Sequence, residues 1–112
     1  MNGLAILDLD HVVATFGSLD GARDLLGFFL ETTAPILDEV ERGLDAGDAE
    51  EGRRAAHAAA GAARTAGAQE LAKLCSEIEI LAVKGDLSAA RERVAPMRAA
   101  FGRVETIILK EL

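Results

Sequence analysis

One segment organises the rest of the chain: Arg53-Arg54-Ala55-Ala56-His57-Ala58-Ala59-Ala60-Gly61-Ala62-Ala63-Arg64. Alanine is the strongest helix former, so this segment is predicted to be helical. Because residues three and four apart share a face of a helix, one side carries His57 together with Arg53, Ala60, Gly61 and Arg64. A second side carries alanines, at positions 56, 59, 63 and 66, and is suited to packing. The first side leaves an imidazole nitrogen open to a large partner, so we expect His57 to be the functional residue.

A long helix is predicted before this segment, and the sequence also indicates where the helix that contains the segment begins and ends. Ser18 is a suitable N-cap for a long helix over about residues 19–44, whose apolar side chains follow the alternating three-and-four spacing of a bundle helix. Asp48 then caps the helix that carries His57, and Gly67 ends it, as a glycine after the last turn commonly does. Phe28 lies outside the apolar stripe of the long helix. Either the N-terminal segment covers it, or it is an exposed contact for a partner.

Two more helices complete the predicted fold. One begins near Ala68 and ends at Lys84-Gly85, and the last begins at Asp86 or Ser88, with a kink expected at Pro96. The last helix has the clearest apolar repeat of the chain, at Leu87, Ala90, Val94, Met97, Phe101, Val104 and Ile108. No strand pattern is found, and short connections between long helices force antiparallel neighbours. The sequence therefore predicts an all-α, up-down-up-down antiparallel four-helix bundle, with residues 8–16 as a short extra helix.

Composition narrows the class of protein. The 112 residues suit one domain spanning 1–112, and 50% of them are hydrophobic, which is typical of a globular chain. The net charge of −7 argues against nucleic acid and anionic membranes as main partners. A single cysteine and two histidines exclude an internal disulfide and argue against a structural zinc site, so we expect no metal. The N-terminus lacks a signal-peptide pattern and no apolar run could span a membrane, so we expect a cytoplasmic protein.

Eight residues share the spacing of a known motif: His57, Gly61, Gly67-Ala68, Leu71, Cys75 and Ile78-Glu79. In this order they resemble the histidine-containing phosphotransfer (Hpt) domain, whose pattern is, loosely, His-x-Leu-Lys-Gly, then Gly-Ala-x-x-Leu, then Cys-x-x-Leu-Glu. The resemblance extends over the whole chain, because the helices before and after the motif also lie where the family has them. Two positions depart from the pattern. Ala59 replaces a bulky aliphatic residue, and Ala60 replaces a lysine thought to help hold the phosphoryl group.

The resemblance implies a set of site residues around His57, which would be phosphorylated on Nε2. Glu79 would orient the imidazole by accepting a hydrogen bond from Nδ1, and Gly61 lies where a side chain would crowd the phosphoryl group. Arg64 and Arg53 could supply the positive charge that the missing lysine would have given. Receiver docking is expected on Ala56, Ala60 and Phe28. From spacing alone, Glu79 is equally a solvated charge, and the arginines could instead pair with Glu50, Glu51 or Glu70.

The function implied is that of a free-standing phosphocarrier in a multistep two-component phosphorelay. Its partners would be receiver domains or a hybrid histidine kinase, with phosphoryl groups passing between receiver aspartates through His57. Magnesium would belong to the receivers and the chain would need no cofactor; it has no nucleotide-binding motif, so no ATP-dependent kinase activity is expected. Ala60 motivates an alternative, an adaptor of the same fold that binds a receiver or kinase without transfer. A third hypothesis is an unrelated bundle with a buried His57. We expect a monomer, although the stripe of residues 87–108 would also suit a dimer.

Overall fold

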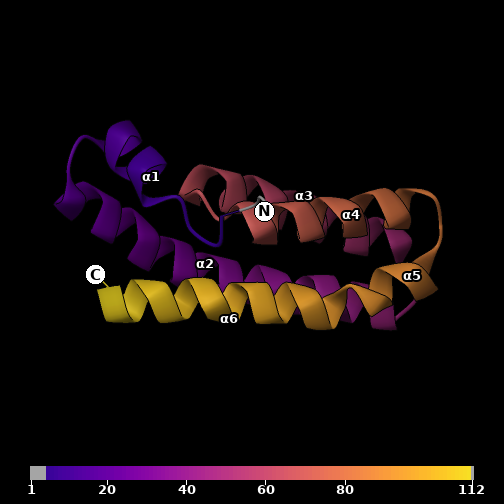
Figure 1. The fold of residues 1–112 in the computed structure, drawn as a ribbon. Coiled ribbons are helices and arrows are strands. Elements are labelled where there is room, and N and C mark those ends of the chain that lie inside the picture. The colour runs from indigo at the N-terminus through magenta and orange to yellow at the C-terminus, as the bar shows by residue number, and fades with distance from the viewer. Residues whose placement is uncertain (1–4, 112) are drawn as a thin grey trace.

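The computed structural model describes residues 5–111 of the chain, and all of its regular structure is helical (Figure 1). Six helices lie within this range: α1 (Leu9–Phe16), α2 (Leu19–Asp45), α3 (Ala49–Ala66), α4 (Gln69–Val83), α5 (Leu87–Glu92) and α6 (Val94–Glu111). No strand is found among the same residues. The all-α prediction is therefore confirmed, and the short N-terminal helix is present.

The helices form an antiparallel bundle in which α3 is the central element for the site. α3 packs mainly against α2 on one side and α4 on the other, while α6 contacts both α2 and α4. Figure 1 shows α6 lying alongside α2 for most of its length, and α1 resting against the first part of α2 at one end of the bundle. Short turns join the successive long helices, as an up-down-up-down bundle requires. The predicted four-helix architecture is thus confirmed.

Serine and aspartate side chains begin three helices at the positions that the sequence predicts. The Ser18 hydroxyl accepts a hydrogen bond from the backbone N–H of Gly21 at 3.0 Å, which starts α2. The Asp48 carboxylate accepts one from the backbone N–H of Glu51 at 3.1 Å, which starts α3. Asp86 caps α5 in the same way. Each bond gives a partner to an N–H group that has none inside its helix.

The last helix is divided into α5 and α6, which differs from the single kinked helix that we expected. The interruption falls at Arg93, three residues before Pro96, which then lies in the first turn of α6. A proline ring crowds the carbonyl of the residue four positions earlier, here Glu92, so the helix is interrupted ahead of the proline. A first turn needs no N–H at that position, and Pro96 is tolerated there. α2, by contrast, continues as one helix through Pro35.

Small residues allow α2 and α3 to approach closely below the site. A Cβ atom added to Gly43 would lie 2.8 Å from the backbone nitrogen of Gly52, and one added to Gly52 would lie 2.9 Å from Cδ2 of Leu44. At Gly43 the close atom is backbone and cannot move aside, so this position requires glycine, whereas at Gly52 the close atom is the end of a leucine side chain, which can shift. Further along α3, six alanine side chains belong to the hydrophobic core: those at positions 55, 56, 59, 60, 63 and 66.

The turn between α3 and α4 is anchored by the segment that precedes α1. Gly67 ends α3 with a φ of 77°, in the left-handed region that glycine adopts without strain. Its carbonyl accepts a hydrogen bond from the Asp8 backbone N–H at 2.8 Å, and the Glu70 N–H donates to the Ala5 carbonyl at 3.1 Å. Gln69 also contacts this segment through its side chain. These bonds hold the junction that fixes how α3 and α4 lie against each other.

Candidate functional site

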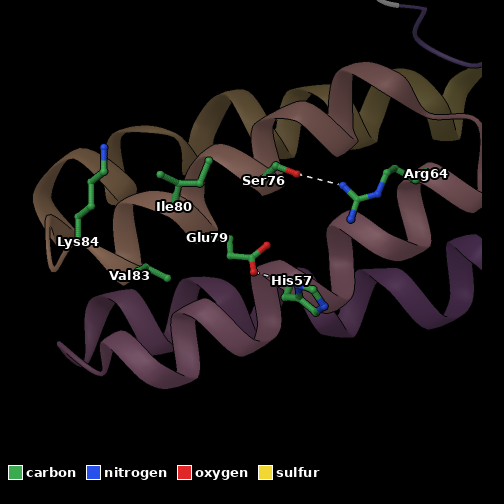
Figure 2. Close-up of a pocket in the computed structure, with 7 residues that line it drawn as sticks. All are labelled: His57, Arg64, Ser76, Glu79, Ile80, Val83 and Lys84. Carbon is green, nitrogen blue, oxygen red and sulfur yellow. Dashed lines mark hydrogen bonds and ion pairs between the residues drawn. The ribbon is translucent and has the colours of Figure 1, made fainter.

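His57 projects from the outward face of α3, and its side chain is 64% exposed. Its Nδ1 atom lies 2.9 Å from Oε2 of Glu79, whose side chain is only 24% exposed (Figure 2). An ionised carboxylate can only accept hydrogen bonds, so Nδ1 is the nitrogen that carries the proton. In the neutral ring Nε2 is then left with a free lone pair. The site therefore presents an exposed imidazole in one tautomer and one orientation, with a nucleophilic nitrogen free.

The antiparallel pairing of α3 and α4 explains why these two residues meet. Gly67 lies at the turn, ten residues after His57 and twelve residues before Glu79. At about 1.5 Å per residue, the two side chains are about 15 Å and about 18 Å from the turn along their helices, and thus nearly level. The hydrogen bonds around Gly67 set this register. The contact between His57 and Glu79, expected from the resemblance, is present.

A groove of about 410 Å³ extends from His57 along the junction of α3 and α4. It is lined by His57, Arg64, Ser76, Glu79, Ile80, Val83 and Lys84 (Figure 2). Arg64 is exposed and its Nη1 atom donates a hydrogen bond to the hydroxyl of Ser76 at 3.2 Å across the groove. Within the described residues 5–110, no carboxylate forms an ion pair with Arg64. Arg64 is thus a cation in the same groove as His57, held only by a neutral group.

Arg53, the other predicted cation, is used differently. Its Nε atom donates to both carboxylate oxygens of Glu50, at 2.7 and 2.9 Å. That hydrogen bond lowers the pKa of Glu50, and it raises the pKa of Arg53 in turn. Arg53 therefore follows the alternative given above, pairing with a glutamate, here Glu50 of its own helix. Arg53 is not among the residues that line the groove beside His57.

The prediction that Ala56 and Ala60 form a docking surface is wrong. Both side chains have no exposed surface and belong to the core. The reason is that α3 is covered on two sides, by α2 and by α4, so the buried arc of the helix is wider than one stripe. The outward face consists instead of residues on the remaining arc: His57, Ala58, Gly61, Ala62, Arg64 and Thr65. A Cβ atom at Gly61 would meet nothing within 4 Å, so the surface one turn beyond His57 is open.

Apolar side chains are exposed on both sides of this outward face. Phe28 of α2 is 64% exposed, so the N-terminal segment does not cover it. It lines a second groove, of about 210 Å³, between α2 and α3, together with Leu25, Phe29, Thr32, Gly61, Ala62, Thr65 and Ala66. On the other side, Ile80 and Val83 of α4 are exposed and line the groove beside His57. Sequence reasoning missed these two residues and Ser76. Ile80 and Val83 lie outside the apolar stripe that α4 buries, and this is the signal that could have found them.

Other reactive groups in the described residues lie away from the surface or are dispersed. Cys75 is buried in the core, and this burial raises the pKa of its thiol to about 12, so it stays protonated at neutral pH. No group of three or more His, Cys, Asp or Glu side chains in the described part of the chain is placed to hold a metal ion. Among the same residues, no helix has the combination of length and apolar character needed to cross a membrane.

Comparisons with known proteins point to one family. The family model of the Hpt domain matches residues 24–107, which include the described α3 and α4 with His57 and Glu79. The chain is similar to the crystal structure of histidine-containing phosphotransfer protein B (HptB) from Pseudomonas aeruginosa PAO1, with 31% sequence identity and a TM-score of 0.87. That match covers 97% of this chain and 96% of the other. No curated protein sequence gives a significant match.

Proposed function

The chain belongs to the histidine-containing phosphotransfer family, and from the geometry around His57 we propose that it carries phosphoryl groups on this residue between the aspartates of receiver domains. The observation that carries the proposal is the 2.9 Å contact between Glu79 and Nδ1 of an exposed His57. It leaves Nε2 as the accessible nucleophile. Family membership makes the third hypothesis, an unrelated bundle with a buried histidine, wrong.

The proposed reaction moves one phosphoryl group without a proton leaving the attacking nitrogen. The lone pair of His57 Nε2 attacks the phosphorus atom of a receiver aspartyl phosphate. An N–P bond forms, the P–O bond to the aspartyl group breaks, and the aspartate leaves as a carboxylate. Transfer to a second receiver is the same exchange in reverse, with the second carboxylate as the nucleophile. Magnesium bound by the receiver would neutralise charge on the moving group.

Glu79 has a charge role in this scheme as well as an orienting one. Once Nε2 bonds to phosphorus while Nδ1 keeps its proton, the imidazole ring becomes cationic. The carboxylate of Glu79, 2.9 Å from Nδ1, stabilises that positive charge. The same contact holds the ring in place, so the geometry of attack is set before the partner arrives. Because the Glu79 side chain is largely shielded from solvent, water screens this interaction less than it would on an open surface.

The exposed apolar residues on both sides of His57 are the proposed docking surface for a receiver domain. Phe28 lies at the groove between α2 and α3, and Ile80 and Val83 lie at the groove between α3 and α4. On the outward face between them, the residues Ala58, Gly61 and Ala62 beside His57 are small, so a partner can approach the imidazole closely. Apolar contacts around a small open centre suit a transient interface that must form and separate at each transfer.

A non-transferring adaptor remains the second candidate, and one observation favours it. The position three residues after His57 is Ala60, whose side chain is buried, so no cation reaches the phosphoryl site from there. An adaptor would keep the docking surface and bind a receiver or kinase without accepting its phosphoryl group. The two candidates differ in covalent labelling, which gives a direct test.

The test is labelling by a phosphorylated receiver domain in the presence of magnesium. We expect acid-labile, alkali-stable label on the wild type and on His11→Gln, and none on His57→Gln. His11 is a matched control because it is also an exposed helical histidine, on α1. Label that persists in His57→Gln would overturn the assignment of the phosphorylated residue. Binding of receivers with no label on the wild type would establish the adaptor instead.

A further inference from the structure

A phosphoryl group on His57 would bring two negative charges to a place that already holds the Glu79 carboxylate. Without a nearby cation this concentration of charge would oppose transfer. Four cationic side chains lie on the adjoining parts of α3 and at the end of α4: Arg53, Arg54, Arg64 and Lys84. The contacts of each side chain indicate which of them is free to bind the phosphoryl group.

Three of these four side chains are either bound to carboxylates or directed away from His57. Arg53 is bound to both oxygens of Glu50, and Arg54 is bound to Glu51 and to Glu39. Removing either arginine from its carboxylates would cost a charge-assisted hydrogen bond. Lys84 lines the far end of the groove, and Figure 2 shows its ammonium group directed away from the imidazole of His57.

Arg64 differs from these residues in both position and partner. It lines the same groove as His57, and Figure 2 shows its guanidinium group reaching from α3 toward α4 on the side where Ser76 and Glu79 lie. Its hydrogen bond to the Ser76 hydroxyl, at 3.2 Å, is long and involves a neutral acceptor. A phosphoryl oxygen is a stronger, charged acceptor, and the exchange of one for the other would be favourable. Arg64 is an exposed residue, so its side chain can turn without disturbing the core.

The position of Arg64 on the helix also fits this role. Residue 64 lies four positions after residue 60, so it is one turn further along the same stripe of α3. Ala60 is completely buried, whereas Arg64 is exposed and lines the open groove. Position 64 lies seven residues after His57, which is about two turns or about 10 Å along the helix. A long, planar, permanently charged arginine side chain is suited to reach back over this distance and to bind two phosphoryl oxygens at once.

We propose that Arg64 is the phosphoryl-binding residue of this protein: its guanidinium leaves Ser76 and binds the phosphoryl oxygens on His57 Nε2. This inference rests on the proposed phosphocarrier function. Ser76 is then a holding residue, which keeps Arg64 in the groove while His57 is unmodified and takes no part in the bond that forms.

The experiment measures the rate of phosphoryl transfer from a phosphorylated receiver to His57, over a range of receiver concentrations, for the wild type and four variants. For Arg64→Ala we expect the maximal rate to fall about 10- to 100-fold, which corresponds to one charge-assisted interaction, with KM changed less than about twofold. Arg64→Lys should recover part of the rate. Arg53→Ala, the matched control on the same helix, and Ser76→Ala should stay within about threefold of the wild type.

A second readout separates binding of the phosphoryl group from a structural effect. The ³¹P resonance of phosphorylated His57 should shift in Arg64→Ala and stay unchanged in Arg53→Ala. Wild-type labelling of His57 together with equal rates and equal ³¹P resonances for the two arginine variants would overturn this inference and leave the phosphocarrier function standing. Absence of label on wild-type His57 is a different result, which would remove the proposed function and this inference with it.

Discussion

The two faces of α3 contain the same kind of residue and do opposite things. The inward face is made of alanines that are completely buried between α2 and α4, among them Ala56, Ala59 and Ala60. The outward face also carries alanines, such as Ala58, but they are exposed and surround His57. Small side chains let helices pack closely on one face and let a partner protein approach closely on the other. What an alanine contributes here depends on which neighbouring helix covers it.

The largest effect that we expect comes from placing one charge on each face. Ala60→Asp would bury a carboxylate with no partner and should lower the free energy of unfolding by about 3 kcal/mol or more. Ala58→Asp puts the same side chain in solvent and should cost under about 1 kcal/mol, mainly from helix propensity. Urea denaturation of both variants measures the difference. Equal losses would mean that the two faces of α3 are not buried as described.

A smaller effect is expected where the outward face meets α4. Glu79→Gln keeps an oxygen that can accept from Nδ1 of His57 but removes the negative charge, so the phosphorylated, cationic ring is less stable. We expect the transfer rate to fall about tenfold, and Glu79→Ala to lower it by up to about 100-fold. Glu77→Gln is the matched control, because Glu77 is also on α4 but pairs with Arg93 and Lys73.

Rates measured with a phosphorylated receiver would test this prediction. If Glu79→Gln and Glu77→Gln transferred equally fast, the carboxylate beside His57 would have no role in charge stabilisation.

The smallest effect is expected for Gly61 on the outward face of α3, which we compare with Gly43 of α2. Gly61 lies on the open face, and a Cβ atom there meets nothing within 4 Å, so Gly61→Ala should raise the free energy of unfolding by about 0.5–1 kcal/mol. Gly43 of α2 faces the closely packed side of α3, where a Cβ atom would lie 2.8 Å from the Gly52 nitrogen. Gly43→Ala should therefore destabilise by about 1–3 kcal/mol. Chemical denaturation checks both signs, and a stabilising Gly43→Ala would contradict the close crossing of α2 and α3.

Most of the fold could be predicted from the sequence, because its signals are local. The apolar repeats, the caps at Ser18, Asp48 and Asp86, and the glycine at 67 each act within one or two turns of a helix. The division of the last helix was missed by only a few residues, since the effect of Pro96 falls on the preceding turn. Helix spacing gives the direction of a side chain, but not how many neighbours cover it. That is why Ala56 and Ala60 were misplaced.

The candidate site depended on a different source of information. The positions of His57 and Glu79 followed from the resemblance to a family, because their contact joins two helices and no local pattern encodes it. Which arginine stands beside the histidine could not be predicted, since Arg53 and Arg64 both share its face by spacing. Arg53 is bound by the carboxylate of Glu50, whereas Arg64 lines the groove between α3 and α4 that also contains His57. The first depends on a competing side chain and the second on tertiary packing, so the spacing of residues along the helix predicts neither.

The proposed function requires that His57, oriented by Glu79, is phosphorylated on Nε2. The most direct measurement is a ¹⁵N–³¹P correlation NMR experiment on ¹⁵N-histidine-labelled protein after phosphorylation by a receiver domain. We expect coupling of phosphorus to Nε2 of His57, with the proton remaining on Nδ1. Coupling to Nδ1, or to a nitrogen of His11, would contradict it.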